Sequence, residues 1–114
     1  MALQEPTFLI LTSLAQGRRH GYALIKDAEQ LSGGRIALKV GTLYAALERL
    51  SVEGLVAAAG EEVVEGRLRR FYVLTEEGAA SLAEVVERMR SLSTQAAARL
   101  QQRPGLATTG LAFA

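Results

Sequence analysis

The chain has 114 residues, of which 49% are hydrophobic and 22% are charged, and its formal net charge is +1. This composition fits one globular domain with an ordinary apolar core and excludes a disordered chain. The chain has no cysteine, which excludes disulfides, thiolate zinc sites and cysteine nucleophiles. Because residues 1–20 contain no signal-peptide pattern and no apolar run reaches membrane-spanning length, a cytoplasmic location without membrane contact is expected.

Two helices are expected in the first third of the chain. Pro6 suits the first turn of a helix because its missing N–H costs little there. Residues 17–21 form a basic turn, and the second helix that follows is ended by Gly33 and Gly34. The apolar positions that predict these helices are Phe8, Leu11, Leu14 and Ala15 in the first and Tyr22, Ile25, Ala28 and Leu31 in the second. Residues 36–40 alternate in character, which predicts a short strand or an extended linker.

The stretch Lys39–Gly54 is interpreted as a recognition helix, a helix that enters a DNA groove, with its helical part at about 41–53. Its leucines at 43, 47 and 50 share one face, which is expected to pack on a core. The other faces near the helix start carry small, polar or aromatic side chains that leave room for a major groove. The closing glycine, followed by a leucine, predicts a left-handed helix end.

The chain then changes to strand-like content. Residues 55–59 and 68–74 favour strands, and the polar stretch 61–67 between them contains Gly66, so a β-hairpin is predicted. Thr75 followed by two glutamates is typical of a helix start, because a hydroxyl can cap the first turn and acids meet the positive end of the helix dipole.

The last helix is predicted to begin at Thr75, and its apolar side chains form a seam. The seam residues are Leu82, Val85, Val86, Met89, Leu92, Ala96 and Leu100. Steps of three and four residues place them on one helix face. This face predicts dimerisation through the helix; the alternative is that the helix folds back on the first three helices. The tail after Pro104 has no periodicity and is expected to be mobile.

The basic residues form three local groups. They are Arg18, Arg19 and His20, then Arg35 and Lys39, then Arg67, Arg69 and Arg70. Each group alone fits ordinary solvated charge. However, three helices followed by a hairpin is the order of a winged helix-turn-helix domain, in which helix three lies in the major groove and the hairpin is the wing. In a mainly α fold of this kind with a small β-hairpin, the groups would converge on one face and meet DNA phosphates.

Four blocks of the sequence resemble the PadR-like family of transcriptional regulators. They are His20-Gly21-Tyr22; Gly41-Thr42-Leu43-Tyr44 with Leu47, Leu50, Gly54 and Leu55; Gly66-Arg67 with Arg70-Phe71-Tyr72; and Leu74-Thr75-Glu76-Glu77-Gly78. The likeness covers roughly residues 8–100. It implies a homodimeric repressor that binds a two-fold symmetric operator in double-stranded DNA and is released by a small ligand. It points to the short subfamily, whose single C-terminal helix packs against the partner subunit.

The resemblance also implies which residues meet DNA. Together with their neighbours in the basic groups, the predicted DNA-binding residues are Arg18, Arg19, His20, Tyr22, Lys39, Thr42, Tyr44, Arg67, Arg69 and Arg70. Val40 and Ala45 replace a serine or proline and a proline found in many relatives, so the base contacts are expected to differ. Because the chain has no tryptophan, a pocket that stacks flat drugs between tryptophans is not expected.

The predicted domains are residues 1–75 for the winged helix-turn-helix, 76–103 for the dimerisation helix and 104–114 for the tail. The sequence has no Gly-rich phosphate loop, no nucleophile elbow and a single histidine, so neither enzymatic activity nor a metal or cofactor is expected. Two other classes remain open, a winged-helix protein-interaction module and a ligand-sequestering protein. Salt-sensitive binding of duplex DNA distinguishes a regulator from both.

Overall fold

The computed structural model describes residues 4–105. The elements in chain order are α1 (Glu5–Leu14), β1 (Arg19–His20), α2 (Gly21–Leu31), α3 (Val40–Val52), β2 (Val56–Val64), β3 (Arg67–Leu74) and α4 (Glu76–Gln101). Contacts within the chain group residues up to Ala83 into one compact unit and those from Glu84 into a second. The element order and the long last helix confirm the predicted fold, while the domain boundary proposed at residue 75 stays a prediction.

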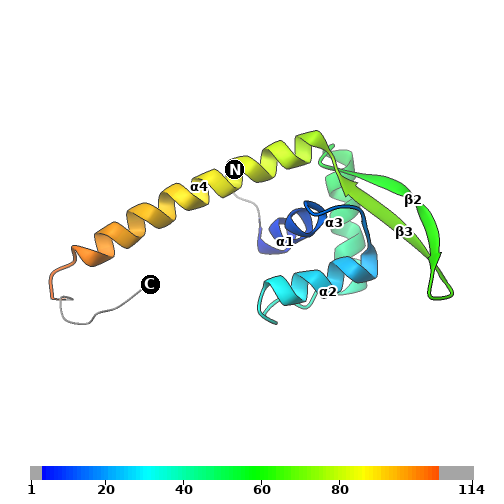
Figure 1. Cartoon of the computed structure of the whole chain (residues 1–114), viewed down its shortest axis with the longest axis horizontal. Coiled ribbons are helices and arrows are strands. Elements are labelled where there is room, and N and C mark those ends of the chain that lie inside the picture. The colour runs from blue at the N-terminus through cyan, green and yellow to red at the C-terminus, as the bar shows by residue number, and fades with distance from the viewer. Residues whose placement is uncertain (1–3, 106–114) are drawn as a thin grey trace. The chain divides into compact units, whose positions relative to one another are not determined.

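The core of the first unit lies between helices α1, α2 and α3. Its largest fully buried apolar side chains are Ile10, Leu11, Leu14, Leu24, Leu43, Leu47, Leu50 and Val56. The three helices gather at the base of the β2–β3 hairpin, and the turn of the hairpin projects away from them (Figure 1). The helices therefore form the base on which the wing is mounted.

The buried faces of the first two helices differ from the predicted stripes. In α2 it is Leu24, not Ile25, that is fully buried, and Tyr22 and Leu31 are about half exposed. In α1 the neighbouring residues Leu9, Ile10 and Leu11 are all buried. A helix that packs against several elements buries more than one face, so a single-stripe pattern places its core residues imperfectly.

Helix α3 follows the sequence-based expectation closely. Its three leucines are fully buried. The helix ends in a Schellman motif, in which Leu55 N–H donates to the Leu50 carbonyl at 2.9 Å and Gly54 N–H donates to the Ser51 carbonyl at 3.1 Å. Gly54 has a φ of 81°, a left-handed conformation that glycine adopts without a Cβ penalty. The predicted helix end is thereby confirmed.

The sheet has three antiparallel strands in the order β1-β3-β2, so the predicted hairpin gains a third strand. Strand β1 pairs Arg19 with Tyr72 and His20 with Phe71. Two residues within a Gly-flanked basic turn have no periodicity, so only the partner strand reveals β1. Of the segment 36–40, for which a strand or linker was predicted, residues 36–39 are a linker without strand structure, and Val40 is the first residue of α3.

The hairpin is longer than predicted because residues 61–64, assigned to the loop, belong to strand β2. The turn contains only Glu65 and Gly66, with φ values of 52° and 79°. Positive φ at both positions is the signature of a type I′ turn, which suits the twist of a two-residue hairpin.

Thr75 joins the end of α3 to the start of α4. Its Oγ1 accepts a hydrogen bond from Gly78 N–H at 2.9 Å and donates one to the Gly54 carbonyl at 2.6 Å. Its N–H donates to the Leu55 carbonyl at 3.1 Å. The predicted helix cap is thereby confirmed, and the same hydroxyl also holds the chain that leaves α3.

From Glu84 to Gln101 the second unit is a continuation of α4 as an uninterrupted helix. No helix among residues 4–105 is long and apolar enough to cross a membrane. Residues 106–114, which make up most of the tail predicted to be mobile, lie outside the described residues.

Candidate nucleic-acid interface

A groove of about 490 Å³ lies where the starts of α2 and α3 meet the end of the wing. Its lining comes from all three elements and consists of Gly21, Tyr22, Ile25, Val40, Tyr44, Glu65, Arg67 and Arg69. Four of the ten residues predicted to bind DNA are therefore brought together around one concavity. Lys39 and Thr42 are exposed at the start of α3.

The two tyrosines of the groove are held by α2 and α3 and remain partly open to solvent. Tyr44 is 40% exposed and Tyr22 is 52% exposed. A Cβ at position 21 would collide with the Tyr44 hydroxyl, so glycine lets this ring lie against the start of α2. Tyr44 thus packs on the second helix and keeps an accessible surface for a ligand.

The three arginines of the wing differ in their contacts and in their exposure to solvent. The guanidinium of Arg69 lies 5.5 Å from the centre of the Tyr22 ring, within cation–π range. Its buried Nε has no hydrogen-bond acceptor among residues 4–105. Arg70 Nε lies 3.8 Å from the Glu61 carboxylate, and a hydrogen bond with Tyr72, followed by the charge of Glu61, raises the pKa of Arg70. Arg67 is exposed beside the turn.

Arg18 and Arg19, although predicted as phosphate contacts, are engaged within the protein. Arg18 donates to the Ala59 carbonyl at 2.9 Å and to the Glu62 carboxylate at 2.7 Å. Arg19 donates to the Ser13 carbonyl at 3.1 Å and to the Gln16 side chain at 3.0 Å. The guanidinium donors of Arg18 and Arg19 are therefore already used within the protein, whereas Arg67 of the wing is exposed.

His20 is a helix cap in this structure. Its Nδ1 accepts a hydrogen bond from Ala23 N–H at 3.3 Å, and its ring meets the edge of Phe71 with 5.3 Å between ring centres. Burial and the nearby charge of Arg69 lower the pKa of His20, partly offset by Glu65. The neutral imidazole is therefore the form that caps α2.

Three further polar contacts hold α1 against α2, against α3 and against the segment between those two helices. Ser13 Oγ donates to Asp27 at 2.6 Å, Arg49 donates to Thr7 Oγ1 at 2.9 Å, and Arg35 pairs with Glu5 at 2.7 Å. On sequence alone, Arg35 had been grouped with Lys39 as a basic residue. Partners more than ten positions away leave no local signal, so these ties could be found only in the folded chain.

A model of the Transcriptional regulator PadR-like family matches residues 10–84. The chain belongs to the PadR-like family. This stretch contains α2, α3 and the wing, so the family match covers the whole candidate interface. Members of the family are transcriptional regulators and not enzymes, which confirms the interpretation of the sequence as a DNA-binding regulator without a catalytic site.

Three relatives illustrate the likeness. The chain is 31% identical over 105 residues to Transcriptional regulator YqjI of Escherichia coli (strain K12), covering 88% of this chain and 49% of that protein. It therefore spans about half the length of this relative. A PadR family regulator from Clostridium difficile R20291 gives a TM-score of 0.70 at 26% identity, over 85% of this chain and 99% of that one. Bacillus subtilis PadR, solved in complex with operator DNA, has the same fold, with a TM-score of 0.63 at 21% identity over 73% and 47% of the two chains.

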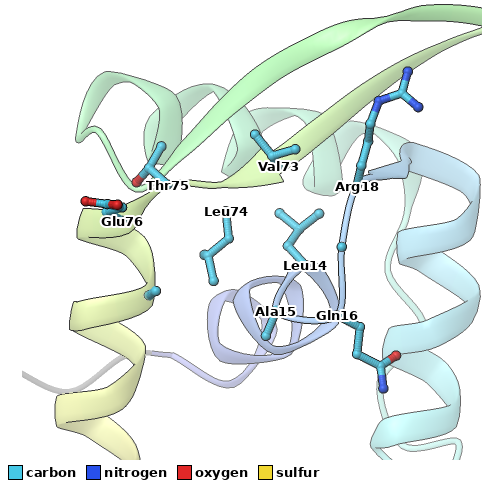
Figure 2. Close-up of a pocket in the computed structure, with 10 residues that line it drawn as sticks. Leu14, Ala15, Gln16, Arg18, Val73, Leu74, Thr75 and Glu76 are labelled. Atoms are coloured by element: carbon cyan, nitrogen blue, oxygen red, sulfur yellow. The ribbon is translucent and has the colours of Figure 1, made fainter.

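The PadR-like chain has a second cavity, of about 380 Å³, beside the loop after α1. Leu14, Val73 and Leu74 supply apolar lining, and Thr75 and Glu76 add polar groups at one end (Figure 2). The cavity is open to solvent, and its lining combines apolar side chains with several polar ones.

The pKa of His20 predicts a loss of stability in acid. Since the folded-state pKa lies below the ordinary value of 6.5, the unfolded chain binds more protons between the two values, and stability falls as the pH drops below about 6.5. The unfolding temperature of the wild type should therefore fall more from about pH 7 to about pH 5 than that of His20→Asn, which keeps a capping acceptor and does not titrate. Equal losses in thermal melts monitored by circular dichroism would contradict this.

Proposed function

We propose that this PadR-like protein is a homodimeric repressor that binds an inverted-repeat operator. Helix α3 would enter the major groove and the wing would lie along the neighbouring backbone. The observation that carries this proposal is the groove formed by Tyr22, Tyr44, Arg67 and Arg69 at the start of α3. Aromatic and guanidinium groups at this point can hold a phosphate while exposed Lys39 and Thr42 reach base edges.

The wing carries acidic residues beside its arginines. They reduce its positive electrostatic potential, so each arginine would act on DNA mainly through direct contact. Glu65 lines the groove itself, and Glu61 lies beside Arg70. With a formal net charge of only +1, the protein has little long-range attraction for DNA. Affinity would then depend on a few well-placed contacts, for which exposed Arg67 and the groove-lining side chain of Arg69 are the best placed.

The dimer is proposed on the apolar seam of α4. In this helix Met89 is 50% exposed and Leu92 is 64% exposed. Val85 is partly exposed and lies on the same helix face. Large apolar side chains at this spacing are typical of a helix that packs against another helix. A second copy of the chain would supply that helix and would place two recognition helices on one operator.

Release by a small ligand is proposed through the cavity of Figure 2. Arg18 lines this cavity and also holds the wing, and Thr75 lines it and also holds the end of α3. An apolar ligand seated there would therefore contact one residue that holds the wing and one that holds the end of α3. A screen of small aromatic compounds tests this: a binder that raises the unfolding temperature should lower operator affinity, and binders without effect on affinity would contradict release.

The proposed DNA contacts predict two kinds of variant. Arg67→Ala should weaken binding to all duplexes alike and reduce the slope of log affinity against log salt by about one, because it removes a phosphate contact. Thr42→Val should change which operator is preferred, by about 1–3 kcal/mol for each lost base contact. Genomic selection followed by anisotropy titration at several salt concentrations measures both.

The same titration separates a regulator from the other classes considered. If the wild type binds no duplex in a salt-sensitive way, the repressor proposal fails, and a tight protein partner recovered in a pulldown would favour an interaction module.

A further inference from the structure

The guanidinium group of Arg18 makes three contacts with the wing. Nε donates to the Ala59 carbonyl at 2.9 Å, and Nη2 donates to the Glu62 carboxylate at 2.7 Å. The guanidinium carbon lies 3.9 Å from the centre of the Phe71 ring, which is a close cation–π contact. Figure 2 shows the side chain running from the loop after α1 toward the strands. One side chain thus contacts both strands of the hairpin.

The contacts of Arg18 lie at an irregularity in the strand pairing of the hairpin. The pairing shifts register between Ala58, opposite Tyr72, and Glu61, opposite Arg70. Ala59 and Gly60 together oppose the single residue Phe71, and Gly60 has a φ of 92°. Such a β-bulge bends a strand and increases its local twist, so it sets the direction of whatever lies beyond it. Beyond this bulge lie Arg67 and Arg69.

We propose that Arg18 is a positioning residue, which sets the direction of the outer wing relative to α3 and does not itself contact DNA. The proposal rests on the proposed function. Arg18 directly precedes β1, and His20 at the end of β1 caps α2. The contact therefore couples the bulge to the start of the helix-turn-helix. The planar guanidinium can lie on the Phe71 ring while its edge donates two hydrogen bonds, an arrangement for which the compact ammonium of lysine has no equivalent shape.

The experiment measures the affinity of protein variants for one operator duplex. It compares a substitution of Arg18 that keeps the positive charge with one that removes it. Arg18→Lys keeps the charge and loses the fork, so affinity should fall about tenfold. Arg18→Met should fall equally, with an unchanged slope of log affinity against log salt. Arg67→Met is the matched control and should reduce that slope by about one. If Arg18→Lys binds like the wild type and Arg18→Met loses one unit of slope, Arg18 is a phosphate contact and the proposal is wrong.

Glu62→Gln should change DNA affinity in opposite directions, depending on whether the wing acts by charge alone or is positioned by Arg18. It removes a negative charge from the wing, so a purely electrostatic wing would bind DNA more tightly. If Arg18 positions the wing through Glu62, affinity should instead fall severalfold, and Glu62→Gln should add little to Arg18→Lys because both break one contact. Tighter binding by Glu62→Gln, or a double variant whose losses simply add, would overturn the positioning role.

Amide hydrogen exchange of the free protein tests the same contact without DNA. In Arg18→Lys, exchange across residues 59–70 should accelerate several-fold while exchange in α1 and α3 stays at the wild-type rate. Unchanged exchange in the wing would contradict the proposal even if affinity falls. If the wild type binds no duplex, the proposed function fails by itself, and the exchange result still decides whether Arg18 holds the wing.

Discussion

Gly78→Ala is expected to destabilise the protein by about 2 kcal/mol or more, although alanine normally favours a helix. Within a helix, alanine gains about 1 kcal/mol over glycine. At position 78, however, a Cβ would collide with the carbonyl oxygen of Leu55 and lie 2.8 Å from Leu74 Cδ1. The Leu55 carbonyl also accepts the Thr75 N–H, so moving it weakens the junction between α3 and α4. The steric term should outweigh helix propensity.

Urea unfolding at one fixed protein concentration measures this difference. Gly41→Ala is the matched control, because Gly41 lies in helix α3 and a Cβ there meets nothing within 4 Å. This control should be neutral or stabilising by up to about 1 kcal/mol. If Gly78→Ala proves as stable as the control, the close approach of α4 to the Leu55 carbonyl is not present in solution.

Met89→Glu is expected to convert a dimer into a monomer and to lower operator affinity by roughly 100-fold or more. A charge placed in an apolar helix seam loses its hydration without gaining a partner. A monomer binds one half-site and loses the gain from two linked contacts, which is of order 100-fold to 10,000-fold. Val85→Glu, on the same face, should act in the same way.

Light scattering measures the mass, and anisotropy with the selected operator measures the affinity. Thr94→Glu adds the same charge on the opposite side of α4 and should keep both the wild-type mass and affinity. A wild type that is already monomeric, or a Met89→Glu variant that keeps the dimer mass, would show that the seam does not join two copies. In the second case another surface would have to hold the dimer.

Local sequence patterns were sufficient to predict helix α3 and the start of helix α4. Leu43, Leu47 and Leu50 are each about one helical turn apart. This spacing alone predicts that they share one buried helix face, and all three are buried. The Thr75 hydroxyl caps the N–H of Gly78, three residues further along, so its role as a cap is also local. Such features are predictable because cause and effect lie within one turn.

The candidate interface was predictable only in part. The blocks that resemble the PadR-like family identified the helix-turn-helix and wing, and these bring Tyr22, Tyr44, Arg67 and Arg69 to one groove. The basic cluster before α2 looked equivalent to the wing cluster in sequence. Its arginines have acceptors 41 and 44 positions away, or on α1, and no local pattern reveals such partners.

By itself the sequence determined the order of the helices and the hairpin, the buried face of α3, the C-terminal end of that helix and the family, because these depend on residue spacing and local capping. Only the tertiary structure decided that β1 joins the sheet, that the hairpin has a bulge at Ala59 and Gly60, and that Arg18 grips it there. Strand pairing and side-chain ties join residues far apart in the chain. Whether an arginine faces solvent or a protein acceptor is therefore a property of the fold.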